Sequence, residues 1–252
     1  MSIWGKIVGG AAGFALGGPI GALLGAVAGH AVDKMADSAA PAAAPGGSEG
    51  QLQDGTKQIA FTIGVIVLGA KLAKADGRVT RDEVSAFKQV FHIPPDEAKN
   101  VGRLFDQARK AAHGFEPYAR QVGRLFQDNP AVLEELVDGL FHIARADGKV
   151  TREEIEYLRR VAEIFGFNDE EWQRIRAANV APDEADPYSI LGVARTDDEA
   201  RIKAAYRRLV VENHPDKLMA EGLPQEFVEL ANQKLATINA AYDQIRKERG
   251  LS

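Results

Sequence analysis

The stretch RIKAAYRRLVVENHPD, residues 201–216, combines one face of an amphipathic helix with a polar turn and decides how the C-terminal part of the chain folds. With Ile202 as the reference, Tyr206, Leu209 and Asn213 lie within about 40° of it at roughly 100° per residue. A helix over residues 197–213 is therefore predicted to pack through this face. Pro215 ends the helix, because proline lacks a backbone N–H and fixes φ.

The flanks and back of this predicted helix are basic. They carry Arg201, Lys203, Arg207 and Arg208. Such a face would meet an acidic partner, through contacts that weaken as the salt concentration rises. Val211 is apolar on the outward side near the turn and is a further candidate contact.

A second helix is predicted to begin at Pro224, because apolar residues recur after it at core spacing. These residues are Phe227, Leu230, Ala231, Leu235, Ile238 and Ala241.

Four segments in order resemble the J-domains of DnaJ-type co-chaperones. They are DPYSILGV (186–193), AAYRRL (204–209), HPD (214–216) and INAAY (238–242). The resemblance implies a helical hairpin, within a domain over residues 186–252, that presents His214, Pro215 and Asp216 to a DnaK-type ATPase chaperone. The four cations would supply the docking surface, and the outcome would be faster ATP hydrolysis by the partner.

An enzymatic role for the same turn is the competing hypothesis. His214 and Asp216 would act as base and orienting acid, but no motif marks a serine or cysteine nucleophile. No catalytic residue is therefore expected, and the chain is interpreted as a co-chaperone that activates a partner ATPase.

Composition excludes several classes of protein. The chain has 252 residues, of which 45% are hydrophobic and 27% charged, as in ordinary globular proteins. The net charge of −5 argues against a general nucleic-acid binder, whose surface would be basic. Cysteine is absent from the sequence, which rules out disulfides, thiol nucleophiles and cysteine zinc sites.

The N-terminal segment, residues 1–37, is predicted to hold a single membrane span. No Asp, Glu, Lys or Arg occurs from Ile7 to Val32, Lys6 and Lys34 bracket this stretch, and Trp4 lies where an interfacial aromatic would anchor it. A cleavable signal peptide, a soluble Gly/Ala tail and a peripheral hairpin broken at Pro19 are the alternatives.

Glycine recurs at every fourth position of this segment. The positions are Gly9, Gly13, Gly17, Gly21, Gly25 and Gly29. In a membrane helix they would form a ridge along which two helices approach closely, so a homodimer is predicted.

Residues 38–55 are rich in Ala, Pro and Gly and are predicted to be a flexible tether, with a partly helical Ala tract as the alternative. The next domain, residues 56–180, is predicted to be entirely helical, which makes the whole chain all-α. Helices are expected at 58–70, 80–91, 94–112, 117–126, 130–146, 151–165 and 169–178. The first of these is apolar but too short to span a membrane easily, so we expect it to be a buried core helix.

An internal repeat organises this domain. KADGRVTRDE (74–83) recurs as RADGKVTREE (145–154), and each copy separates two predicted helices. Gly77 and Gly148 suit the left-handed conformation that ends a helix. In each copy a threonine precedes a glutamate by three residues, which is the capping-box spacing. Two related helix–turn–helix units are therefore predicted.

The repeat matches only the second half of a calcium-binding EF-hand loop, because Leu72, Lys74, Ile143 and Arg145 hold the earlier ligand positions. It resembles instead the TerB-like domains, a family associated with tellurite resistance and proposed binding of divalent metal ions. That resemblance implies a possible ion held by Asp76, Glu83, Asp147 and Glu154. The alternative is that these carboxylates cap helices and interact with helix dipoles.

The order of segments resembles the membrane-anchored DnaJ-like proteins of the DjlA type. That resemblance implies a single-pass protein of the bacterial inner membrane, in contact with lipid, with most of the chain facing the cytoplasm. The alternative function is a metal-responsive sensor or scaffold in envelope stress or tellurite resistance. The connection over residues 179–185 is short, so some packing between the last two domains is expected.

Overall fold

The computed structural model describes residues 18–21, 49–73, 93, 98–110, 114–146, 148, 150–179 and 185–250. These residues contain helices and turns but no strand, which confirms the all-α prediction. The helices are α4 (Glu49–Leu72), α6 (Ala98–Lys110), α7 (Glu116–Leu125), α8 (Pro130–Ala144), α9 (Arg152–Phe165), α10 (Asp169–Asn179), α11 (Pro187–Leu191), α12 (Glu199–Glu212), α13 (Pro215–Ala220), the short 3-10 helix η1 (Gln225–Phe227) and α14 (Val228–Arg249). We call α4–α10 the central domain and α11–α14 the C-terminal domain.

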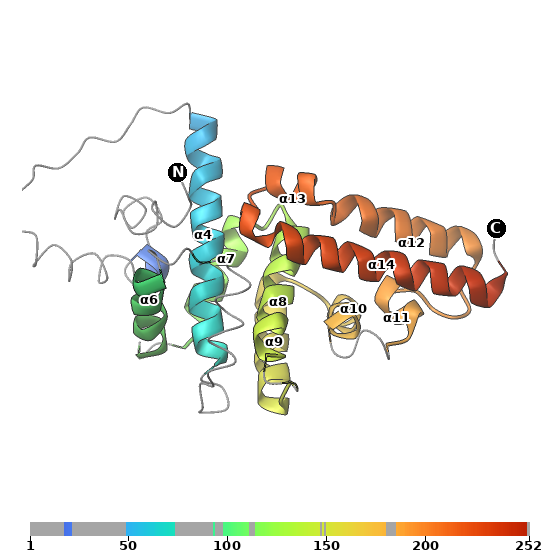
Figure 1. Ribbon diagram of the computed structural model, residues 1–252, viewed down its shortest axis with the longest axis horizontal. Coiled ribbons are helices and arrows are strands. Elements are labelled where there is room, and N and C mark those ends of the chain that lie inside the picture. The colour runs from blue at the N-terminus through green and yellow to red at the C-terminus, as the bar shows by residue number, and fades with distance from the viewer. Residues whose placement is uncertain are drawn as a thin grey trace, which may run out of the picture.

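The central domain is built around α4, which contacts α6, α7 and α8. In Figure 1, α4 stands upright with α6 on one side and α8 and α9 on the other. Its residues from Ile59 to Leu72 are all buried, as predicted for an apolar core helix. The largest fully buried side chains of this core are Phe61, Phe126, Phe141 and Phe227, the last from the C-terminal domain.

The start of α4 differs from the prediction. The helix begins at Glu49 rather than near Gln58, so the end of the stretch predicted as a flexible tether is helical. Glu49, Gln51, Leu52 and Gln53 are good helix formers, and they extend the apolar helix backwards despite the glycines among them. None of the helices that the structure describes combines the length and hydropathy needed to cross a membrane.

Local chemistry sets the other helix boundaries. α8 begins with Pro130, which tolerates the first helical position because the N–H there has no partner. α9 begins after Thr151 and ends at Gly166, whose φ of +93° favours glycine. Gly148, with φ +103°, adopts the left-handed conformation predicted for it, while Gly77 lies outside the described residues.

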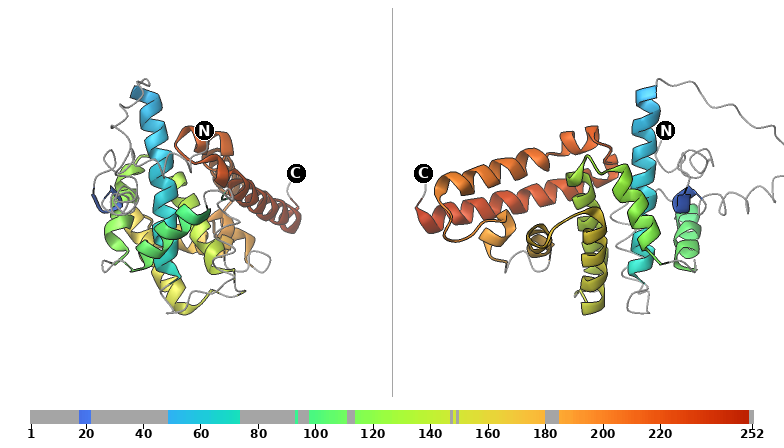
Figure 2. Two further views of the ribbon diagram at one scale, coloured as in Figure 1. Left: turned by 60° about the vertical axis from the view of Figure 1, so that its left-hand side comes forward. Right: turned by 180° about the vertical axis from the view of Figure 1, so that it is seen from behind.

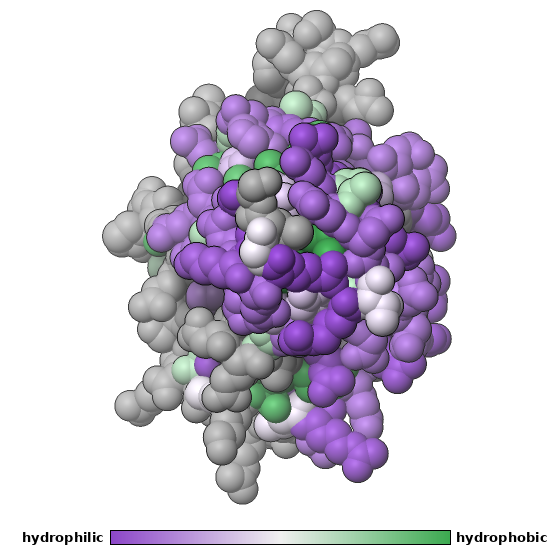
Figure 3. All heavy atoms as spheres, turned by 90° about the vertical axis from the view of Figure 1, so that its right-hand side faces the viewer, coloured by the Kyte–Doolittle hydropathy of each residue, from purple (hydrophilic) through white to green (hydrophobic). Residues whose placement is uncertain are grey.

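The C-terminal domain is a helical hairpin in which α12 and α14 run side by side (Figures 1 and 2). Ile202 and Leu209 from α12 are buried with Ile238, Ala241 and Ile245 from α14. This confirms the packing face predicted for α12. The end of the hairpin farthest from the central domain is mainly hydrophilic on the face drawn in Figure 3.

α14 takes part in two hydrophobic cores. Its second half, from Ile238 onward, packs within the C-terminal domain. Ala231 in its first half, together with Leu223 and Phe227 just before it, is buried in the core of the central domain instead. The two domains therefore share one helix, and the expected packing between them is extensive.

Candidate functional site

His214, Pro215 and Asp216 form the start of α13. His214 has an extended backbone, and its imidazole Nδ1 accepts a hydrogen bond from the backbone N–H of Asp216 at 3.3 Å. Pro215 occupies the first turn of the helix, where a missing N–H costs nothing. The predicted turn is therefore short, because the proline that ends α12 also begins α13.

The two polar side chains of the tripeptide point to solvent. The His214 side chain is 52% exposed and that of Asp216 is 84% exposed, whereas Pro215 is buried. Since Nδ1 is the acceptor, a neutral imidazole carries its proton on Nε2, which can donate to a partner protein. The 3.8 Å between Nδ1 and the Asp216 carboxylate is too long for a hydrogen bond, so the pair lacks the geometry of a base and its orienting acid.

Two of the four cations on the basic face of α12 form ion pairs with neighbouring carboxylates, and the other two form none with the residues that the structure describes. Arg201 lies 3.2 Å from Asp197, and Arg208 lies 3.3 Å from Glu212. Within the described part of the chain, no ion pair is recorded for Lys203 or Arg207. Arg207 is exposed and Lys203 is half-buried. These two cations are the ones whose charge remains available to a partner.

Val211 lies on the outward side of α12, close to the tripeptide. It is 62% exposed and is the one exposed large apolar side chain among the described residues. Its position agrees with the expectation that it faces outward near the turn.

The hairpin that carries these groups is held by aromatic and polar contacts. The rings of Tyr206 and Tyr242 stack with centroids 4.0 Å apart, and the Tyr206 hydroxyl donates to Asn239 at 3.0 Å. At the far end, Arg249 donates to the Tyr188 hydroxyl at 2.9 Å and to the backbone oxygen of Asp197 at 2.7 Å. These contacts fix the orientation of α12.

The carboxylates predicted as metal ligands can be compared with the structure at one position only. Glu154 is buried, and its carboxylate accepts from the backbone N–H of Thr151 at 2.7 Å and from the Thr151 hydroxyl at 2.9 Å. The predicted capping box is therefore present in this copy of the repeat. Asp76, Glu83 and Asp147 lie outside the described residues, and among the residues described no three carboxylate or histidine groups are arranged to hold an ion.

Of the glycine ridge, only Gly21 belongs to the described residues, in a helical turn over residues 18–21. Ile20 in that turn is fully buried against the central domain, and its backbone N–H donates to the Gln121 side chain at 3.0 Å. The remaining glycines of the ridge lie outside the described part of the chain.

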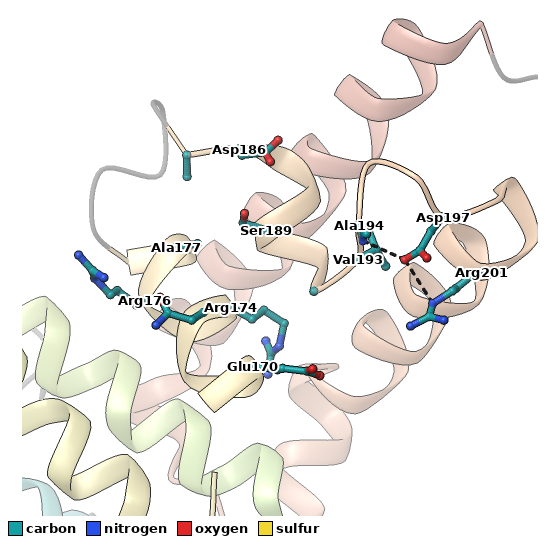
Figure 4. A pocket seen from close by; sticks show the side chains of 13 residues that line it. Glu170, Arg174, Arg176, Ala177, Asp186, Ser189, Val193, Ala194, Asp197 and Arg201 are labelled. Atoms are coloured by element: carbon teal, nitrogen blue, oxygen red, sulfur yellow. Dashed lines mark hydrogen bonds and ion pairs between the residues drawn. The ribbon is translucent and has the colours of Figure 1, made fainter. Parts of the chain in front are cut away.

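A cleft of about 580 Å³ lies at the junction of α10 with the start of the C-terminal domain. Figure 4 shows Arg174 and Arg176 on one side and Ser189, Asp197 and Arg201 on the other. Asp197 accepts from the backbone N–H of Ala194 at 2.8 Å and pairs with Arg201. Much of the charge that lines this cleft is thus already held in ion pairs within the protein.

Sequence reasoning missed a buried cluster of charges between the domains. Lys234 of α14 lies 2.7 Å from Glu134, 3.2 Å from Glu135 and 2.8 Å from Asp138, all three on α8. Arg174 of α10 donates to both carboxylate oxygens of Glu134. The side chains in these contacts are at most 10% exposed.

Burial and pairing shift the pKa values of this cluster in opposite directions. Burial alone would raise the pKa of Glu134, but Arg174 and Lys234 outweigh it and hold that pKa below its ordinary value. Burial raises the pKa of Glu135 to about 7, despite Lys234 and with help from Asp138 and Glu134. Burial also raises the pKa of Asp138.

A signal of this cluster is present in the sequence. The helix PAVLEELVDGLFHIA (130–144) is apolar around most of its circumference, which indicates a helix covered on all sides. Its three carboxylates then need buried cationic partners. Lys234 could not be identified as one of them, because it is distant in the sequence and lies in another domain.

Three family models match the chain in order. The co-chaperone DjlA transmembrane domain matches residues 1–51, the tellurite resistance protein TerB matches residues 62–177, and the DnaJ domain matches residues 186–249. The last two ranges fall inside the predicted domains over 56–180 and 186–252.

Curated relatives named co-chaperone protein DjlA match most of the chain. The protein of Coxiella burnetii is 30% identical over 215 residues, which cover 77% of this chain and 79% of the relative. Those of Photobacterium profundum and Photorhabdus laumondii are 32% and 31% identical, and the matches cover 75% and 77% of this chain and 78% and 81% of the relatives. No solved structure matches the chain.

Proposed function

The chain belongs to the DjlA family of co-chaperones, and on this premise we propose that its C-terminal domain docks on a DnaK-type ATPase and accelerates ATP hydrolysis by it. The observation that carries the proposal is the tripeptide at the start of α13, where His214 and Asp216 are exposed beside the basic face of α12. The relatives are named co-chaperones, which favours this function over a metal-responsive sensor.

The cations of α12 supply the electrostatic part of docking. Lys203 and Arg207 attract an acidic groove most strongly, since no carboxylate of the described residues pairs with them. Arg201 and Arg208 contribute after exchanging Asp197 and Glu212 for the partner's carboxylates. Docking therefore weakens as the salt concentration rises.

The tripeptide acts on the partner by differential binding. His214 offers its Nε2–H and Asp216 offers an exposed carboxylate, and both are held by the rigid start of α13. If these groups bind the hydrolysis-competent state of the ATPase more tightly than its resting state, they shift the partner toward hydrolysis. The reaction itself remains the partner's chemistry.

The N-terminal segment anchors the protein in the bacterial inner membrane in this proposal. Support comes from the match to the DjlA transmembrane domain and from the absence of Asp, Glu, Lys and Arg between Ile7 and Val32. The central and C-terminal domains face the cytoplasm, where a DnaK-type partner and its ATP are found. Protease added to intact inner-membrane vesicles of defined orientation tests which side these domains occupy.

Self-association through the glycine ridge completes the proposal, which requires the turn over residues 18–21 to leave its contact with the central domain on entering the membrane. Replacing both Gly17 and Gly21 by Leu removes the close approach of two helices, so association in a membrane reporter should be lost. Association that persists in this double variant contradicts a dimer built on the ridge.

The central test is steady-state ATP hydrolysis by a DnaK-type chaperone with the full chain added in detergent micelles. We expect stimulation by the unaltered chain and none by His214→Gln, which alters the group offered to the partner. Lys247→Ala is the control, because it removes an exposed cation from α14 rather than from α12. Equal stimulation by His214→Gln and the unaltered chain overturns the proposal.

A further inference from the structure

The contact between the central and C-terminal domains has an apolar part and an ionic part. Leu223, Phe227 and Ala231 are fully buried in the core of the central domain. About one turn farther along α14, Lys234 places its ammonium among the three carboxylates of α8. The ionic part is thus assembled only when the two domains meet.

The cluster is negative by one charge when every member is ionised. Glu134, Glu135 and Asp138 contribute three negative charges, and Lys234 and Arg174 contribute two positive ones. Two further charges act at its margins and cancel, because Arg145 acts on Asp138 and Glu171 acts on Arg174. An uncompensated buried charge is costly, so the cluster is neutral only with one additional proton.

Glu135 is the carboxyl that holds this proton. It is completely buried, and neither of its oxygens accepts a hydrogen bond from the described residues, although Lys234 lies 3.2 Å away. Glu134, in contrast, receives two hydrogen bonds from Arg174 and remains ionised. Asp138 accepts a hydrogen bond from the Asn179 amide, which partly offsets the rise in its pKa that burial causes.

We propose that α8 is an intramolecular docking surface for the C-terminal domain, and that docking takes up one proton at Glu135. Undocking admits water to α8 and so removes the burial that raises the pKa of Glu135; this outweighs the loss of Lys234, which acts in the opposite direction, and the proton is released. A fall in pH therefore shifts the equilibrium toward the docked state, and a rise in pH shifts it toward the undocked state.

The direction and range follow from the two protonation states. The pKa of Glu135 is about 7 when the domains are docked, against an ordinary value of 4.5. Docking therefore weakens as the pH rises from about 4.5 toward 7 and changes little above that. Glu134, whose pKa is held below the ordinary value by Arg174 and Lys234, opposes this trend only near and below pH 4.5. Asp138, whose pKa burial also raises, acts in the same direction as Glu135.

The docked arrangement leaves the candidate partner-binding groups exposed. The side chains of His214 and Asp216 are 52% and 84% exposed while Lys234 is held on α8. Docking therefore sets the direction in which the C-terminal domain presents these groups, without covering them.

The absence of cysteine from the chain makes undocking measurable. Ala231→Cys places a thiol inside the interface, and its rate of modification by a methanethiosulfonate reagent in the full chain in micelles reports how often the interface opens. Dividing by the rate of the exposed Ala240→Cys at the same pH removes the effect of thiol ionisation. We expect the normalised rate to rise on the order of 50-fold between pH 5 and pH 8.

Glu135→Gln in the Ala231→Cys background is the decisive control, because the amide is neutral at every pH. Its normalised rate should change much less over the same range. Val161→Cys, in the core of the central domain, should react more slowly than Ala231→Cys, since it is reached only by unfolding. The proposal is overturned by a level profile with Glu135 intact, by an unchanged pH dependence in Glu135→Gln, or by equal rates at Ala231→Cys and Val161→Cys. Leu223→Cys repeats the measurement at a second buried position if Ala231→Cys disturbs folding.

Discussion

The ring of Phe227, from the C-terminal domain, stands edge-on against the ring of Phe61 in α4, with centroids 4.7 Å apart and planes at 83°. Both side chains are fully buried, and Phe61 also meets Phe126 with centroids 6.0 Å apart. Aromatic pairs of this geometry are favourable beyond the area they bury. The C-terminal domain thus contributes an aromatic ring to the centre of its neighbour's core.

Phe227→Ala should destabilise the central domain although the substitution lies outside it. Truncating a buried phenylalanine leaves a cavity and costs about 3–5 kcal/mol, which urea unfolding of the full chain, followed by circular dichroism, can measure. Phe227→Leu keeps most of the volume and should cost clearly less. A loss below about 1 kcal/mol for Phe227→Ala contradicts the shared core.

Lys234→Met should be costly because it leaves three buried carboxylates with one cation. Breaking such a buried ion pair from one side typically costs about 3–5 kcal/mol. The cost should be smaller at pH 5 than at pH 8, because the carboxylates left without Lys234 can take up protons at the lower pH. Unfolding of both proteins at the two pH values gives the comparison.

Combining Lys234→Met with Glu135→Leu should restore much of that stability. At pH 8, where Glu135 is mainly ionised, the double variant removes one charge of each sign, and apolar replacements of buried ion pairs are often neutral or stabilising. If the loss of stability in the double variant equals the sum of the losses in the two single variants, Lys234 and Glu135 are not directly coupled.

Thr151→Ala should lower the stability of the central domain by about 1 kcal/mol, because it removes the N-cap of α9. Thr151→Ser keeps the hydroxyl and should have a much smaller effect.

Divalent ions should leave the melting temperature of the chain unchanged, because the Glu154 carboxylate is already occupied by its hydrogen bonds to Thr151. A melting temperature that rises with divalent ions, and no longer rises in an Asp76→Asn, Asp147→Asn variant, contradicts this and favours a metal site.

Lys203→Ala and Arg207→Ala should weaken stimulation of the DnaK-type partner more than Arg201→Ala and Arg208→Ala do. Asp197 and Glu212 already neutralise the second pair, so its removal loses less attraction. We expect a shift of about two- to fivefold in the concentration for half-maximal stimulation for each of the first two variants, decreasing at high salt. Equal shifts in all four variants contradict the division of the basic face.

The sequence predicted faces of helices better than it predicted their partners. Among the residues that the 3.6-residue period placed on the two packing faces, those that are buried are Ile202, Leu209, Asn213, Phe227, Ala231, Ile238 and Ala241, whereas Tyr206, Leu230 and Leu235 are half-buried. Periodicity says only that a face is covered, so it could not show that Phe227 and Ala231 belong to the central core.

The missed features share one physical cause, which is dependence on tertiary contact. The carboxylates of α8 and Lys234 meet only in the folded chain, and no local pattern joins them. The capping box at Thr151 and the left-handed Gly148, in contrast, were predictable because their geometry is local. The start of α13 at Pro215 was only partly predictable: proline indicated that α12 ends before it, but proline is equally common at the first position of a new helix.

The division of α14 between two cores limits how the chain can be taken apart or recombined. A graft that exchanges residues 186–252 for a J-domain from another protein would remove Leu223, Phe227 and Ala231 from beneath α4 and α8 and strip the α8 carboxylates of Lys234. The same segment transferred to another protein would expose these three apolar residues to solvent. The two domains therefore cannot be exchanged independently, and any chimaera must keep the stretch from Leu218 to Lys234 together with the α4 and α8 residues that it contacts.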